Sequence, residues 1–348
     1  MANPSFNSIA TKPQRTPRKS FLRVLRTFAV YSLLALLLYF ALRNAPLVDI
    51  WNTLKQLQLS QIGILFMINA VVIASITARW WIIVRAENPS VPFLPLIGYR
   101  LSVFGVSYFT LGPQVGGEPL QVLYLQRNHG LTFARATSAV IMDKLLEFLV
   151  NFLLIGVGAW AIARVGLFPE NGNRFNPSLI AVGAALLIWP LIHIILLYNA
   201  RYPLSALLRR QPFIQPHNKF IRLIIVSERM AAAFCHKHLR SLIASLCVSL
   251  LAIGGIAAEY YLMVSFLGMQ INVIQIFAAL TAMQASFLVP LPGGLGALEA
   301  SQVFALGAFG QTASAAISLA LLMRARDILN GGLGLLLAGR GFKDKIEQ

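Results

Sequence analysis

Charged residues are scarce in this sequence and make up only 12% of its 348 residues. Soluble domains carry about 25% charged residues. Here 57% of the residues are hydrophobic, and the mean hydropathy is +0.70. A chain this apolar would not stay in solution, so the composition predicts an integral membrane protein.

Acidic residues are the scarcest charges, because 12 Asp and Glu stand against 29 Lys and Arg, for a net charge of +17. The basic residues gather before residue 27, between Arg201 and Arg240, and at the C-terminus. This distribution is typical of the cytoplasmic segments of membrane proteins. The basic segments lack interleaved aromatic residues, so we expect no nucleic-acid partner.

The two cysteines, Cys235 and Cys247, are too few for a disulfide framework. Cys235 lies close to His236 and His238, but a fourth ligand is missing, so a solvated basic loop is the better interpretation. The sequence also lacks a Walker-type loop, a His-Glu-x-x-His and a Gly-x-Ser-x-Gly. We therefore expect no metal, no cofactor and no enzymatic activity.

Long apolar runs predict an all-α polytopic membrane protein with about six spanning helices. Residues 1–25 are interpreted as a disordered basic cytoplasmic tail, 26–340 as the transmembrane domain and 341–348 as a second cytoplasmic tail, with a basic cytoplasmic loop at 199–240. The first apolar run resembles a signal peptide, but Arg43 and Asn44 make a poor cleavage site, so we expect it to be retained. The predicted spans are 26–42, 62–84, 133–164, 178–198, 241–267 and 313–339.

Two shorter apolar runs, at 93–111 and 276–309, are interrupted by Gly and Pro. If all basic segments lie in the cytoplasm, the stretch 85–132 begins and ends inside, and the stretch 268–312 begins and ends outside. A single crossing of the membrane is therefore excluded for each stretch. The charge pattern therefore predicts two re-entrant hairpins, near 93–132 and 276–309, that enter from opposite faces.

The expected hairpin tips are the segments GPQVGGEP at 112–119 and PLPGGLGALE at 290–299. Each tip carries a Glu where the next helix would begin, a position that favours negative charge. Glu118 precedes Asp143 by 25 positions, and Glu299 precedes Arg324 by 25. The two halves therefore fit an inverted repeat with a site between them.

Several charged residues fall inside the predicted spans, where each costs about 2.5–3.5 kcal/mol. They could simply neutralise one another: Asp143 and Glu147 share a helix face, and an Arg from 313–339 could pair with them. Their convergence with the hairpin tips favours a translocation site instead. The candidate residues are Arg79, Gly117, Glu118, Asp143, Lys144, Glu147, Pro292, Gly293, Gly294, Gly296, Glu299 and Arg324.

The segment Gly116-Gly117-Glu118, the DKLLE run at 143–147, the LPGGLGALE run at 291–299 and a late Arg324 resemble the transmembrane family of lysylphosphatidylglycerol synthases. The resemblance covers roughly residues 25–340 and implies a flippase-like membrane domain without the synthase domain. Leu120 and Gln121 follow the first tip, where the family often has an Arg, so the family's headgroup preference is not carried over.

Our leading hypothesis is therefore a lipid flippase or scramblase in the cell membrane, with both termini cytoplasmic. Aminoacylated phosphatidylglycerol, another phospholipid, a polyprenyl phosphate and a glycolipid are all open as substrates. The rival hypothesis is an accessory or scaffold subunit of a lipid or glycan synthase, in which the charges serve as structural contacts. A homo-oligomer is also open. An enzyme acting on a lipid-linked phosphate is the third and least favoured hypothesis, because no nucleophile or metal site is visible.

Overall fold

The computed structural model describes residues 47–110, 116–165, 177–210, 219–287 and 296–343, and these residues form helices without any strand. The predicted tail at 1–25 and the predicted span at 26–42 lie outside the described residues. The helices are α2 (Leu47–Lys55), α3 (Leu59–Glu87), α4 (Phe93–Phe109), α5 (Glu118–His129), α6 (Phe133–Val165), α7 (Pro177–Tyr198), α8 (Pro203–Arg210), α9 (Lys219–Lys237), α10 (Leu239–Phe266), α11 (Val273–Ser286), α12 (Ala297–Gly307) and α13 (Ala313–Lys343).

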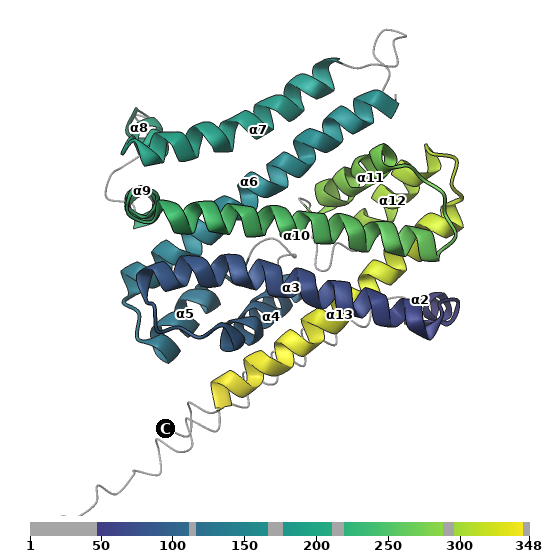
Figure 1. The fold of residues 1–348 in the computed structure, drawn as a ribbon, viewed down its shortest axis with the longest axis horizontal. Coiled ribbons are helices and arrows are strands. Elements are labelled where there is room, and N and C mark those ends of the chain that lie inside the picture. The colour runs from purple at the N-terminus through teal and green to yellow at the C-terminus, as the bar shows by residue number, and fades with distance from the viewer. Residues whose placement is uncertain (1–46, 111–115, 166–176, 211–218, 288–295, 344–348) are drawn as a thin grey trace, which may run out of the picture.

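Four of the described helices are long and apolar enough to cross a membrane: α3, α6, α10 and the part of α7 from Ala181 to Tyr198. They coincide with four of the predicted spans. The fifth, 313–339, falls within α13, whose 31 residues run past the expected domain end at 340. The long helices lie roughly along one direction (Figure 1). The protein is therefore a multi-pass helical membrane protein.

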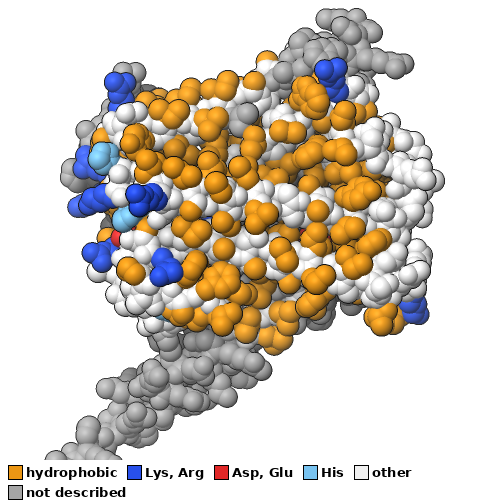
Figure 2. Space-filling model, viewed as in Figure 1, with side chains coloured by type: hydrophobic (Ala, Val, Ile, Leu, Met, Phe, Trp, Pro, Cys, Tyr) orange, Lys and Arg blue, Asp and Glu red, His pale blue; other side chains and the backbone are white. Residues whose placement is uncertain are grey.

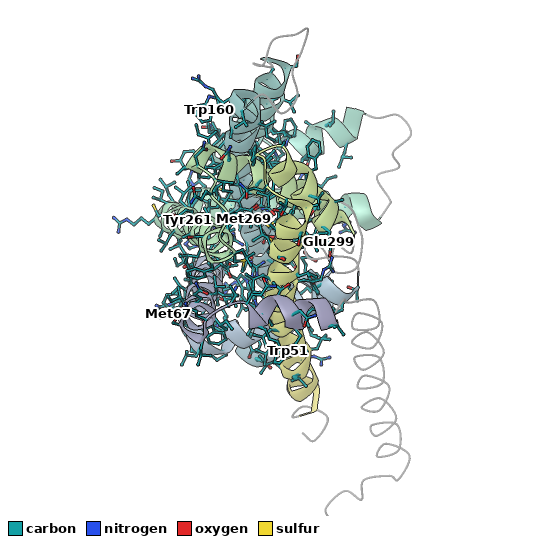
Figure 3. The ribbon with its side chains drawn as sticks, turned by 90° about the vertical axis from the view of Figure 1, so that its right-hand side faces the viewer. Trp51, Met67, Trp160, Tyr261, Met269 and Glu299 are labelled. Carbon is teal, nitrogen blue, oxygen red and sulfur yellow. The ribbon has the colours of Figure 1, made fainter. Side chains whose placement is uncertain are left out.

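The surface agrees with this class. Met67 and Tyr261 are 64% and 50% exposed, and Figure 3 shows both on the same outer side of the bundle. Figure 2 shows hydrophobic side chains across the middle of one face and Lys and Arg gathered mainly at the end where α8 and α9 lie. An apolar band with a basic rim is the pattern expected of a protein surrounded by lipid.

The two short helix pairs occupy opposite ends of the molecule, with α4 and α5 at the basic end and α11 and α12 at the other (Figure 1). Each pair lies between two long helices in the chain: α3 and α6 flank the first, and α10 and α13 flank the second. The same order of elements therefore occurs twice in the chain. Helices of one half pack against helices of the other: α4 against α13, α11 against α6 and α3 against α10.

Helix boundaries in these pairs follow from local chemistry. α5 has Gly117 at its N-cap and ends at Gly130, whose φ of 65° is easy only for glycine. α11 begins with a capping box, in which the Asn272 side chain accepts from the Gln275 N–H and the Gln275 side chain accepts from the Asn272 N–H. These signals fix the start of both α5 and α11 and the end of α5.

Glycine allows helices from different halves of the chain to cross closely. A Cβ on Gly334 of α13 would overlap the Leu101 carbonyl of α4, and one on Gly105 would meet the Gly331 carbonyl oxygen at 2.5 Å. At the other crossing, a Cβ on Gly158 of α6 would overlap Thr281 of α11. Small residues at such crossings let helices in lipid gain van der Waals contact.

The basic segment 199–240 is more ordered than the solvated loop expected from the sequence, because it contains α8 and α9. Cys235 is fully buried in the core, so that part of the interpretation is wrong. Buried Glu228 accepts hydrogen bonds from the N–H groups of Leu204 and Ser205 at 2.8 Å each and also contacts the Ser205 hydroxyl. Glu228 on α9 thus caps the start of α8.

Candidate functional site

A cavity of about 270 Å³ lies inside the bundle, and residues of α3, α4, α5, α6, α10, α11 and α13 line it. Its wall combines apolar side chains such as Val72 and Phe104 with charged ones from both halves of the chain. Polar groups at this depth are costly unless they face a cavity or one another. The charged groups of the wall form two clusters, described in turn.

The first cluster joins α3, α4 and α6 around Asp143, whose side chain is fully buried. Arg79 Nε donates to Asp143 Oδ1 at 2.7 Å, and Arg100 Nη1 donates to Oδ2 at 2.7 Å. Glu147 lies one turn further along α6 and accepts from Arg79 at 3.1 Å and from Arg100 at 3.4 Å. Asp143 does not line the cavity, whereas both arginines and Glu147 do. Asp143 therefore lies behind the cavity wall and positions the two guanidinium groups that line it.

Lys144 connects this cluster to the start of α5, in the helix pair α4–α5. This pair is named the first hairpin here, and the pair α11–α12 the second. Its ammonium lies 3.0 Å from Glu147 Oε1 and 3.2 Å from Glu118 Oε1. Glu118 is the first residue of α5, and its other carboxylate oxygen accepts from the Gly116 N–H at 2.8 Å. The carboxylate is thus held between the hairpin backbone and a cavity lysine. At Gly117, a Cβ would lie 2.6 Å from the carbonyl oxygen and the side chain of Val103, so the close approach of α5 to α4 requires glycine.

The second cluster joins α3, α10 and α13. Arg326 donates to Glu259 at 2.8 Å and lies 2.8 Å from Asp327. The Asn69 amide donates to Glu259 at 3.1 Å, and Asn330 donates to Asn69 at 3.0 Å. All five side chains line the cavity. The two carboxylates share one guanidinium, and the Asn69 amide ties Glu259 to α3.

Glu299 and Arg324 form an ion pair at the second hairpin, and neither lines the cavity. Glu299 Oε2 accepts from the N–H of Gly296 at 3.0 Å, and the φ of 78° at Gly296 requires glycine. Figure 3 labels Glu299 beside α13. This pair repeats the arrangement of Glu118 and Lys144: a carboxylate at the start of a hairpin's second helix, bonded to a loop N–H and to a cation on the next long helix.

The structure brings Arg79, Glu118, Asp143, Lys144 and Glu147 together, and it places Glu299 with Arg324 at the other hairpin. Pro292, Gly293 and Gly294 lie outside the described residues. The suggested pairing of Asp143 and Glu147 with an Arg from 313–339 is wrong, because Arg79 and Arg100 occupy those positions. Sequence reasoning missed Arg100, although a lone Arg in the apolar run 93–111 is itself a signal of an intramembrane site.

Electrostatically, the two clusters and the second hairpin pair gather six of the chain's 12 acidic residues. Five cations, two of them in the second half of the chain, accompany these six carboxylates. In a chain with a net charge of +17, half of the acidic residues are therefore used in these ion pairs. Among the described residues, no group of three or more His, Cys, Asp or Glu could hold a metal ion.

Fold and site together define a multi-pass helical membrane protein with a charged internal cavity between two similar halves. The family described as the lysylphosphatidylglycerol synthase TM region matches residues 24–331, and the chain belongs to this family. This confirms the resemblance inferred from the Gly-Gly-Glu and Pro-Gly-Gly segments. No curated protein matches the chain.

Proposed function

We propose that the protein moves a lipid with a polar, phosphate- or sugar-bearing headgroup across the membrane, as a flippase or scramblase. The observation that supports this most is the cavity lined by ion-paired side chains from both halves of the bundle. Its volume of about 270 Å³ is close to the lower end of the 300–1,000 Å³ typical of ligand pockets. That suits a headgroup whose acyl chains stay in the bilayer.

In this proposal the basic end, with α8 and α9, faces the cytoplasm of the cell membrane, and both termini lie on that side. The pairs α4–α5 and α11–α12 are re-entrant hairpins that enter from opposite faces. The cavity includes Glu118 and Lys144 but excludes Glu299 and Arg324, so the headgroup site extends to the first hairpin. The described conformation is then the one that receives the headgroup from the cytoplasmic leaflet.

Exchange of ion-pair partners gives translocation a physical route. A headgroup phosphate entering the cavity replaces a carboxylate at Arg100 or Lys144, and the released carboxylate takes up a proton or a cationic group of the lipid. We expect no chemical change in the lipid, so the protein is not an enzyme in this proposal. Transport then runs downhill or is driven by an ion or proton gradient.

The test is a flipping assay in proteoliposomes with a panel of labelled lipids, which includes aminoacylated phosphatidylglycerol, other phospholipids, a polyprenyl phosphate and a glycolipid. We expect protein-dependent flipping of one class, which the Glu118→Gln variant loses while it remains folded. Full activity of purified Glu118→Gln would remove the role of that carboxylate. Folded wild-type protein that moves none of the lipids would contradict the function.

A second candidate function is an accessory subunit of a lipid or glycan synthase. It is favoured by the fact that every carboxylate of the two clusters is already ion-paired, as structural contacts would be. In that case Glu118→Gln lowers thermal stability and partner assembly together. Retention of both in a variant that no longer flips lipid would exclude this alternative.

A further inference from the structure

The two hairpins share a feature beyond their glutamates: a glutamine three positions later in each. Gln121 follows Glu118 and Gln302 follows Glu299 at the same spacing, so each glutamine lies about one turn further along α5 or α12. Both side chains are fully buried. The two positions therefore offer a direct comparison within one molecule.

Gln302 has partners for both ends of its amide. Its carbonyl oxygen accepts from the Tyr260 hydroxyl of α10 at 2.6 Å, and its amide nitrogen lies 3.5 Å from the Ala279 carbonyl oxygen and 3.4 Å from the Ser301 hydroxyl. Gln302 does not line the cavity. It is a structural contact that ties α12 to α10.

Gln121 differs in both respects. Neither its amide oxygen nor its amide nitrogen has a hydrogen-bond partner among the residues that the structure describes. Gln121 lines the cavity together with Glu118, Lys144 and Arg100. A buried amide without a partner is costly, and such groups mark places where another molecule supplies the missing bonds.

We propose that Gln121 selects the headgroup by hydrogen bonding to one of its hydroxyl groups, while Arg100 and Lys144 hold the phosphate. An amide offers a donor and an acceptor at once, and a hydroxyl is the smallest lipid group that can use both. A headgroup without a hydroxyl leaves the buried amide unpaired and is bound less well. This inference rests on the proposed function, since it names the class of lipid that the cavity takes: a phospholipid with a hydroxyl-bearing headgroup.

The experiment measures binding rather than transport, so that its failure is separate from failure of the flipping assay. The purified full-length chain in detergent is titrated with dioctanoyl phosphatidylglycerol and with dioctanoyl phosphatidylpropanol, which has the same charge but no headgroup hydroxyl. We expect the wild type to prefer phosphatidylglycerol by roughly three- to tenfold in Kd, the size of one hydrogen bond.

Gln121→Leu is expected to abolish this preference by weakening phosphatidylglycerol binding alone, with an unfolding temperature equal to or above that of the wild type. Gln302→Leu is the matched control: it leaves the Tyr260 hydroxyl without its partner, so it lowers the unfolding temperature and keeps the preference. Gln121→Met, which is closer in shape, replaces Gln121→Leu if that variant does not fold.

A wild type without preference, or a preference that survives in the folded Gln121 variant, overturns the proposal. The proposal also fails if neither Gln121 variant folds, because the amide is then structural. A clear preference in a protein that flips no lipid would retain Gln121 as a headgroup-binding residue and refute the transport function.

Discussion

The two halves of the molecule, α3–α6 and α10–α13, build similar charged sites with the signs exchanged. In the first half the cation Arg79 lies on the first long helix and pairs with acids on the last. In the second half the acid Glu259 lies on the first long helix and pairs with Arg326 on the last. The halves therefore share an ion pair between their two long helices, while the residue types at its two ends differ.

The halves also differ in the ratio of acidic to basic side chains in their clusters and in which ion pair lines the cavity. Asp143 binds two arginines, whereas Glu259 and Asp327 share one. The first hairpin's ion pair lines the cavity and the second hairpin's does not. The two halves are therefore similar in the order of their helices. They differ in how their charges are paired and in which ion pair faces the cavity.

The largest expected effect is on Asp143. Asp143→Asn leaves Arg79 and Arg100 buried with one carboxylate fewer, and the expected loss of unfolding free energy is about 3–5 kcal/mol. Thermal unfolding in detergent measures it.

The counterpart in the second half, Glu259→Gln, is the matched control. Arg326 keeps Asp327 as its partner, so we expect a smaller loss, of about 1.5–3 kcal/mol, the value of a hydrogen bond to a charged group. Equal losses in the two variants would show that the difference in pairing has no energetic consequence.

The crossing of α4 and α13 should be the next most sensitive. Gly334→Ala forces a Cβ against the Leu101 carbonyl oxygen, and because backbone cannot rotate away we expect about 1–3 kcal/mol of destabilisation. Gly158→Ala should cost a similar amount, because the new Cβ would lie 2.5 Å from the Thr281 Cβ, which moves only with the backbone of α11. Gly254→Ala, with nothing within 4 Å of its Cβ, is the control and should be neutral or stabilising. A tolerated Gly334→Ala would mean that the close crossing is not required.

Labelling with a membrane-impermeant maleimide tests whether the two hairpins enter the membrane from opposite faces. Because the labelled positions are exposed, we expect these variants to be as stable as the wild type. Exposed Arg127→Cys on α5 should react from the same side as Lys237→Cys on α9, and exposed Ser314→Cys on α13 from the other side. Cys247 is replaced by Ala in this background. Cys235 can stay, because burial raises the pKa of its thiol to about 11 and leaves little thiolate at neutral pH. Reaction of Arg127→Cys and Ser314→Cys from one side would contradict the inverted arrangement.

Much of the fold was predictable because its signals are local. Apolar runs predicted α3, α6, α7 and α10, and glycine and proline predicted that the runs 93–111 and 276–309 are interrupted, as the short helices α4, α5, α11 and α12 are. The entry of these pairs from opposite faces stays a prediction.

The site was predictable only in part. Asp143, Lys144 and Glu147 are visible in one apolar helix, but their partners come from α3 and α4, and the choice of partner depends on how helices pack. That is why Arg100 was missed and a residue of α13 was expected in its place. Cys235 was misplaced for the same reason, since burial within α9 depends on its packing with α6 and α7.

The central claim is that a lipid headgroup passes through the cavity beside the Glu118 carboxylate, and its most direct test is the flipping rate of Glu118→Gln in proteoliposomes. Glu87→Gln is the matched control, because Glu87 pairs with exposed Arg135 at 3.9 Å outside the cavity. The account predicts that Glu118→Gln falls to the rate of empty liposomes while Glu87→Gln matches the wild type. Wild-type flipping by folded Glu118→Gln would contradict it.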